Sequence, residues 1–260
     1  MITSLHGRTL TAIVLCLLAV PVTAGPQWLL ELGSSTPVSG AAADADCDEP
    51  DSEPARFLSC GQPVDSEAGN GGAWALGFDM PLTDRDAGED RWMAGFRLGR
   101  YDGSTVQARL PQADQADETL HARLSSVYAL AQLRREWGTG VGRLRPYVAG
   151  GAGVARTSVR DFQRRGDDFL QQAPDGDASG YILRLEAGLI WQFGDRLQMG
   201  LALRQDALDA WATPRGDGWL EEGGDRQTRE FAATRARLGY RSATINLSWP
   251  FGRARGDVGD

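Results

Sequence analysis

Two histidines occur in the 260 residues, His6 and His121, and His121 is followed closely by Ser125 and Ser126. A histidine beside a serine can activate the hydroxyl as a nucleophile for acyl transfer. In an extended strand, however, residues four apart lie about 13 Å from each other, because each residue advances the chain by about 3.3 Å. The spacing therefore favours a solvent-exposed histidine, and we predict no catalytic residues unless another strand supplies a partner.

Metal and cofactor chemistry is restricted by composition. All 27 residues of the Lys+Arg total are arginine, which excludes Schiff-base chemistry and a phosphate-loop lysine. The stretch Asp44–Asp48 begins like a calcium loop, but Glu49 stands where a glycine is required and Ala55 replaces the closing glutamate. We predict no cofactor and no defined metal site. An acidic, solvated loop is the favoured interpretation, with a looser divalent-ion site as the alternative.

The first 24 residues have the layout of a secretory signal peptide. Arg8 precedes an apolar run over Leu10–Val20, and the small-residue ending Val-Thr-Ala reaches Ala24 before Gly25. The apolar run is too short for a comfortable membrane-spanning helix. We therefore expect cleavage after Ala24 and export of the mature chain.

Two cysteines remain after this cleavage, Cys47 and Cys60, with twelve residues between them. Export brings them into an oxidising compartment, so we predict that they form a disulfide. Chain-entropy arguments value a closed loop of this size at roughly 3 kcal/mol. The intact mass of the non-reduced protein, with and without thiol alkylation, tests this prediction, and alkylation of either cysteine before reduction would rule the bridge out.

Alternation of apolar and polar residues with a period of two recurs through the mature chain and predicts β-strands. It is clearest at residues 181–193, YILRLEAGLIWQF, where Tyr181, Leu183, Leu185 and their successors form one apolar face. Eight strands are predicted in this way, over residues 27–33, 72–80, 91–101, 120–134, 145–156, 180–193, 196–207 and 236–251. The connections between them alternate strictly between long and short.

That alternation is typical of barrels of the outer membrane, which have long external loops and short periplasmic turns. The predicted fold class is therefore all-β, an eight-stranded antiparallel up-and-down transmembrane barrel over residues 25–251, followed by a short periplasmic tail at 252–260. Several aromatic residues fall near the predicted strand ends, where an interfacial girdle belongs. The predicted periplasmic girdle comprises Trp28, Phe78, Trp92, Trp137, Tyr147, Trp191, Phe193, Trp249 and Phe251, and the opposite girdle comprises Tyr101, Tyr181 and Tyr240.

The polarity of the two faces separates this barrel from a soluble one. A lipocalin-type barrel would have an apolar interior and a polar outer surface. Here a continuous leucine-rich face would aggregate in water, so we expect it to contact lipid and the charged face to point inward. The predicted interior charges are Glu31, Arg97, Arg184, Glu186 and Arg204. They would fill the bore as ion pairs, and a narrow channel lined by them is the alternative.

The predicted external loops are acidic. Residues 34–71 carry a formal charge of −7, residues 102–119 carry −3, and residues 157–179 and 208–235 carry −2 each, so that the loops hold −14 against −9 for the mature chain. This surface disfavours nucleic acid and favours basic partners or divalent cations.

The run Arg145–Ala155, RPYVAGGAGVA, resembles a strand of the small outer-membrane barrels related to the OmpA membrane domain and the opacity proteins, and residues 245–251, INLSWPF, are similar to their last strand. The resemblance implies the outer membrane of a Gram-negative bacterium, with the loops at the cell surface. Its implied partners are outer-membrane lipid, lipopolysaccharide and the barrel-assembly machinery. A non-enzymatic structural or surface-interaction role is expected; a barrel-rim enzyme that modifies lipopolysaccharide is the alternative.

Overall fold

The computed structural model describes residues 26–44, 65–82, 90–112, 115–138, 144–167, 169–193, 197–222, 224–231 and 233–250. The predicted signal peptide at 1–24, the tail at 252–260 and both cysteines of the predicted disulfide, Cys47 and Cys60, lie outside these residues. Those predictions stay predictions. Among the described residues, no helix is long and apolar enough to cross a membrane.

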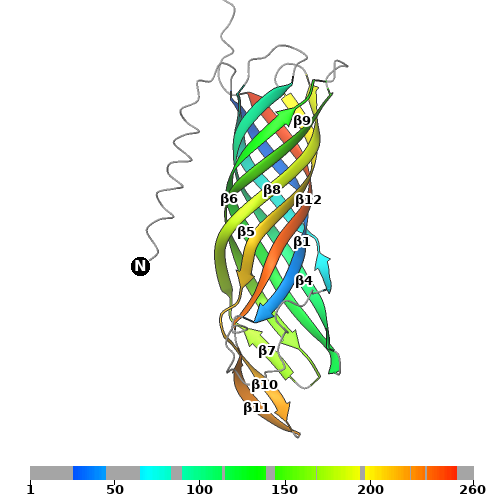
Figure 1. Ribbon diagram of the computed structural model, residues 1–260, viewed down its shortest axis with the longest axis vertical. Coiled ribbons are helices and arrows are strands. Elements are labelled where there is room, and N and C mark those ends of the chain that lie inside the picture. The colour runs from blue at the N-terminus through cyan, green and yellow to red at the C-terminus, as the bar shows by residue number, and fades with distance from the viewer. Residues whose placement is uncertain are drawn as a thin grey trace, which may run out of the picture.

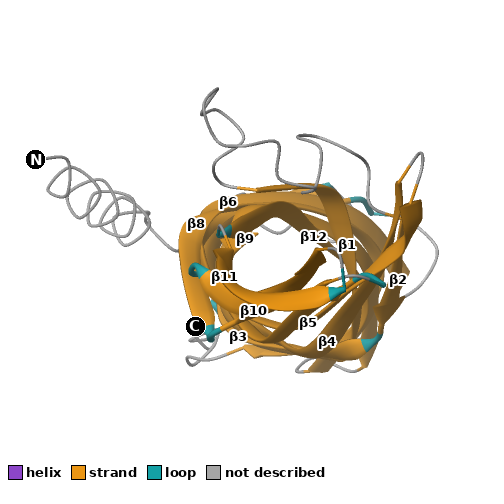
Figure 2. Ribbon diagram, turned by 90° about the horizontal axis from the view of Figure 1, so that it is seen from below, coloured by secondary structure: helices purple, strands orange, loops and turns teal. Residues whose placement is uncertain are grey.

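Eight long strands form a closed antiparallel barrel (Figures 1 and 2). They are β1 (Gln27–Asp44), β3 (Gly71–Pro81), β4 (Arg91–Gln112), β5 (Gln115–Glu136), β6 (Leu144–Arg165), β8 (Gly176–Phe193), β9 (Leu197–Ala212) and β12 (Thr234–Pro250). Each pairs with the next along the chain, and β1 pairs with β12 to close the wall. The predicted eight-stranded up-and-down barrel is confirmed, and all eight predicted strands are present.

The two ends of the barrel differ. We call the end where β3 meets β4, β5 meets β6 and β8 meets β9 the turn end, and the opposite end the loop end. Four short strands lie at the loop end, which is the lower end in Figure 1: β2 (Asp65–Gly69), β7 (Phe169–Ala173), β10 (Gly216–Glu222) and β11 (Asp225–Phe231). β2 pairs with β4, and β7, β10 and β11 continue the sheet outward from β6. The described parts of the long connections are thus built largely from strands.

The strands also extend further toward the loop end than predicted. β4 and β5 remain paired as far as Gln112 and Gln115, so most of the predicted loop at 102–119 is a hairpin. A β-bulge between Tyr101 and Ser104 shifts the register, and Gly103 within it has a left-handed φ of 69°, which glycine adopts without strain. Beyond the bulge, the buried positions change from odd to even residue numbers. Because the bulge interrupts the alternation, the predicted strand stopped at residue 101.

Outward-facing side chains of the wall form an apolar belt. Its large members include Leu32, Leu76, Leu98, Val127, Leu133, Val148, Val154, Leu183, Leu185, Leu189, Leu201, Leu203 and Ile245. Exposed tryptophans at the turn end agree with the predicted girdle, but Tyr147 does not: it is buried inside the barrel. Tyr101 and Tyr240, predicted for the opposite girdle, are also buried inside, whereas Tyr181 is exposed. The three misplaced tyrosines occupy inward-facing positions of their strands. Nearness to a strand end therefore did not suffice to predict a girdle residue, because the side chain must also face outward.

The interior near the loop end holds a cluster of apolar side chains, and the polar side chains of Ser104, Arg164 and Gln171 are also buried at this end. The apolar residues of this cluster, which we call the loop-end core, are Val106, Leu120, Ala122, Leu124, Val159, Phe162, Ile182, Leu208, Trp211 and Leu238. The rings of Phe162 and Trp211 lie 6.1 Å apart at an interplanar angle of 56°. These side chains come from β4, β5, β6, β8, β9 and β12, so the core joins most of the wall across the bore.

Candidate functional site

Between the loop-end core and the turn end, the interior holds charged side chains that we call the ion network. Its members are Arg91, Arg97, Arg134, Arg184 and Arg204 with Glu31, Asp79, Glu136, Glu186 and Asp206. Five arginines face five carboxylates, so the network is formally neutral. Each buried charge would cost several kcal/mol if it were unpaired, and pairing offsets that cost. The network is therefore charged without carrying a net charge, and the buried Arg164 of β6 lies outside it, nearer the loop end.

On the side nearest the turn end, two arginines share one aspartate. Arg97 lies 2.8 Å from Asp79, and its Nε donates a 3.0 Å hydrogen bond to Glu31. Arg134 lies 3.0 Å from Asp79 and 2.9 Å from Glu136. The residues come from β1, β3, β4 and β5, so these contacts connect four consecutive strands of the wall.

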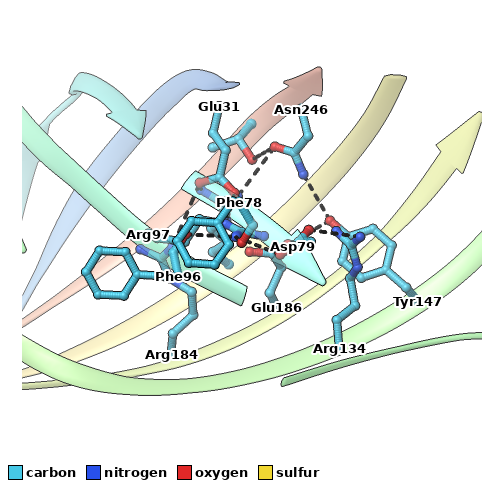
Figure 3. A network of polar contacts seen from close by, with 12 residues as sticks. Glu31, Phe78, Asp79, Phe96, Arg97, Arg134, Tyr147, Arg184, Glu186 and Asn246 are labelled. Carbon is cyan, nitrogen blue, oxygen red and sulfur yellow. Dashed lines mark hydrogen bonds and ion pairs between the residues drawn. The ribbon is translucent and has the colours of Figure 1, made fainter. Parts of the chain in front are cut away.

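Arg204 forms the centre of the network. It lies 2.7 Å from Glu31 and 2.5 Å from Glu186, which come from two different strands and are both labelled in Figure 3. The Tyr147 hydroxyl donates a 2.7 Å hydrogen bond to Glu186, and the Asn246 amide donates a 3.0 Å bond to the Tyr147 oxygen. Since β1, β6, β8, β9 and β12 all contribute, the contacts cross the bore.

Arg184 forms the part of the network nearest the loop end. Its guanidinium donates hydrogen bonds of 2.9 and 2.8 Å to the two oxygens of Asp206 and one of 2.9 Å to the Tyr101 hydroxyl. The same guanidinium lies over the Tyr128 ring, 4.7 Å from its centroid. Tyr101 also donates to Asp206, and its ring stacks on Tyr240 at a centroid distance of 4.2 Å. This layer is in contact with the apolar side chains of the loop-end core.

All five residues predicted for the interior, Glu31, Arg97, Arg184, Glu186 and Arg204, lie in this network. Sequence reasoning missed the others. Asp206 has the same parity as Arg204 and could have been found by continuing that strand's alternation by one step. Asp79 follows an inward run of Ala73, Ala75 and Gly77, whose small side chains gave no sign of a charged interior.

The possible nucleophile–base pair is not assembled. His121 and Ser125 are partly exposed, whereas Ser126 is buried inside the barrel. Ser126 shares hydrogen bonds of 2.9 Å with Thr157 and 3.2 Å with Tyr240. Within the described ranges, no group of three or more His, Cys, Asp or Glu side chains could hold a metal ion. The stretch at 45–48, which resembles a calcium loop, lies outside those ranges.

Exposed ion pairs mark the edge of the apolar belt on its loop-end side. They are Arg100–Asp102, Arg123–Asp161 at 3.4 Å, Arg156–Asp177 at 2.8 Å and Arg160–Asp175 at 3.8 Å. The Ser158 hydroxyl and the Arg156 guanidinium donate hydrogen bonds to Asp177 and hold the pKa of its carboxyl below the ordinary value. Charged side chains at this level indicate that the wall leaves the hydrocarbon region here, and the strands continue beyond it.

The closed wall, the apolar belt around it and the charged, filled interior define a transmembrane β-barrel of the outer-membrane type. No protein-family model and no characterised protein sequence matches the chain. The closed barrel of eight long strands confirms the fold implied by the sequence resemblance. Solved outer-membrane barrels are similar to it. The outer membrane protein OprG from Pseudomonas aeruginosa is 13% identical, with 88% of this chain and 97% of that one covered and a TM-score of 0.47.

Two other barrels are similar at comparable levels. Neisserial surface protein A is 12% identical over 88% of this chain and 98% of its own, with a TM-score of 0.38. The outer membrane protease OmpT from Escherichia coli is 8% identical over 90% of this chain and 99% of its own, with a TM-score of 0.44.

Proposed function

We propose that the protein is a non-conducting structural barrel of the outer membrane that holds a platform of strands at the cell surface. The platform consists of β7, β10, β11 and the parts of β4 and β5 beyond the bulge at Gly103. The observation that carries the proposal is the occupied bore: the ion network and the loop-end core follow each other along the interior. An eight-stranded barrel is just wide enough for side chains to fill.

A conducting pore would need a continuous polar path. Any such path must pass the loop-end core. There Leu124, Phe162 and Trp211, from three different strands, are buried in one apolar cluster. An ion crossing this layer would lose most of its hydration beside apolar side chains, at a cost of many kcal/mol. The narrow-channel alternative is therefore disfavoured by the same residues that support the structural role.

Planar-bilayer recording tests the closed bore. We expect no stepwise conductance from the folded protein, while a sixteen-stranded porin inserted by the same procedure conducts. Heat-modifiable mobility on gels verifies that the inserted protein is folded. Reproducible unitary steps from the folded species would contradict the proposal.

The proposal requires that the loop end faces the cell exterior and the turn end faces the periplasm. In a background with Cys47 and Cys60 replaced by serine, we expect Thr228→Cys, on exposed β11, to react with a membrane-impermeant maleimide on intact cells. Leu82→Cys, which is exposed at the turn end, should react only after the outer membrane is permeabilised. The reverse pattern would invert the orientation.

The proposed role is non-enzymatic, and its partners are those of a surface barrel: outer-membrane lipid, the assembly machinery, and basic proteins or divalent cations at the acidic loop end. The separation of His121 from Ser126 supports it, because Ser126 has its own partners inside the wall. Mass spectra of lipid A from cells with and without the protein should be identical. A lost or gained acyl chain would favour the rim enzyme.

A further inference from the structure

A shallow groove of about 840 Å³ crosses the outer wall over β6, β8, β9, β12 and β1. Its polar lining includes Thr36, Gln205 and Arg241, and its apolar lining includes Val148, Leu185 and Leu203. Leu185 and Leu203 are each 71% exposed, the highest values among the large apolar side chains of the belt. The groove thus combines a cationic part with a long apolar part.

Strand register fixes the direction of this groove across the membrane. Thr36 is paired with Arg241, Arg241 with Gln205, Gln205 with Leu185, and Leu185 with Gly150. Strands of such barrels tilt by about 35–45°, so a row of paired residues runs obliquely along the wall. Thr36 and Arg241 lie in the middle of their strands, whereas Gly150 lies near the turn end of β6. The polar part therefore faces the loop end and the apolar part descends into the belt.

The depth of Arg241 matches the edge of the hydrocarbon region. On β12, the outward-facing residues from Ala243 through Ile245 and Leu247 to Trp249 belong to the belt, and Arg241 is the next outward position. Arg241 and Trp249 are eight residues apart. That distance is about 26 Å along the strand and about 20 Å along the membrane normal, close to the apolar band of about 25 Å. Arg241 consequently lies at the level of lipid headgroups.

Arg241 also lacks a carboxylate partner among the described residues, although it is exposed. Other exposed arginines at this level, such as Arg100, Arg123 and Arg156, are each paired with an aspartate. A free guanidinium beside the Gln205 amide presents several donors to an anion, while the hydroxyl of the neighbouring Thr36 donates to the Asn70 side chain at 2.6 Å. Arginine binds phosphate, as it binds carboxylate, through such paired hydrogen bonds.

We propose that this groove is a binding site for lipid A, with a phosphate on Arg241 and an acyl chain along Leu203, Leu185 and Val148. The inference rests on the proposed orientation, because only then does Arg241 face the leaflet that contains lipopolysaccharide. An acyl chain lying along the exposed leucines adds van der Waals packing to the ionic contact.

Titration of the folded protein in detergent with purified lipid A, followed by native mass spectrometry, tests the site. Arg241→Ala should raise the apparent Kd for lipid A about tenfold, as expected for loss of a charge-assisted bond, while Arg241→Lys should retain most of the binding. Gly150→Leu should also weaken binding by filling the groove, because a Cβ at Gly150 meets no atom closer than 4.0 Å.

Two matched variants serve as controls. Arg237→Ala removes another exposed arginine of β12 outside the groove, and Ala152→Leu enlarges an outward residue of β6 that does not line it. Both should bind lipid A like the wild type. The proposed site would be overturned if Arg241→Ala bound lipid A as tightly as the wild type does. It would also be overturned if the wild type bound phosphatidylglycerol as tightly as lipid A. The maleimide labelling of Thr228→Cys reports the orientation separately, so failure of the groove and failure of the proposed orientation are distinguishable.

Discussion

Replacing Arg184 by leucine is expected to lower the free energy of unfolding by roughly 3–5 kcal/mol. The guanidinium of Arg184 donates to both oxygens of Asp206 and to the Tyr101 hydroxyl inside the barrel. Leucine would leave Asp206 as a buried carboxylate with one partner fewer and an uncompensated charge. Urea unfolding of the folded protein in detergent micelles or bilayers measures the difference.

Leu183→Ile is the matched control. Leu183 is the neighbouring residue of β8 but faces outward, where half of its surface is exposed. An exchange between isomers of equal volume against lipid should change stability by less than about 1.5 kcal/mol. Equal unfolding midpoints for the two variants would show that the ionic contacts of Arg184 do not stabilise the folded barrel.

The prediction of the barrel succeeded because a membrane wall imposes its polarity on every second residue. In β8, leucines at 183, 185 and 189 face lipid while Arg184 and Glu186 face the interior, so sequence parity alone separates the two environments. The same parity places Glu31 and Arg97 inside, since each is flanked by apolar residues on both sides, and Arg204 inside, since it alternates with Leu201 and Leu203.

Beyond the belt, that logic no longer applies. Outside the membrane, the outer face of a strand is polar, as at Arg123 and Arg160, and the interior is apolar, as at Leu124 and Val159. Polarity therefore reverses along a single strand. The bulge at Gly103 adds a change of parity to this reversal. The alternation of apolar outward and polar inward residues holds only within the belt. The extensions of β4 and β5 beyond the belt were therefore predicted as loops.

Partners within the ion network could not be derived from the sequence. Arg97 and Arg134 both contact Asp79, and Arg204 bridges Glu31 and Glu186. These contacts form because the stagger between strands places the side chains at the same height in the barrel. Stagger is a property of the closed barrel and is not contained in the alternation of any one strand. The charges were predictable, and their connectivity was not.

The second large effect is expected in the loop-end core. Trp211→Ala should lower the free energy of unfolding by about 3–5 kcal/mol, since it removes a large buried side chain and leaves a cavity beside Phe162. No lipid surrounds this part of the wall, so its strands depend on the packing of their own interior side chains. Urea unfolding and hydrogen exchange at the loop-end parts of β4, β5 and β9 should both report the loss.

Trp219→Ala is the control for this substitution. Trp219 lies on β10, is partly exposed, and packs against the Arg226 guanidinium at 4.2 Å from the ring centroid. An exposed contact of this kind contributes about 0.5–1 kcal/mol, so its removal should change the unfolding midpoint far less than Trp211→Ala does. If both variants unfolded at the same urea concentration, the loop-end core would not be what holds the strands together beyond the belt. A loss confined to Trp211→Ala, with faster exchange at Leu124 and Phe162 and unchanged exchange at Arg97, would locate the stabilisation in that core.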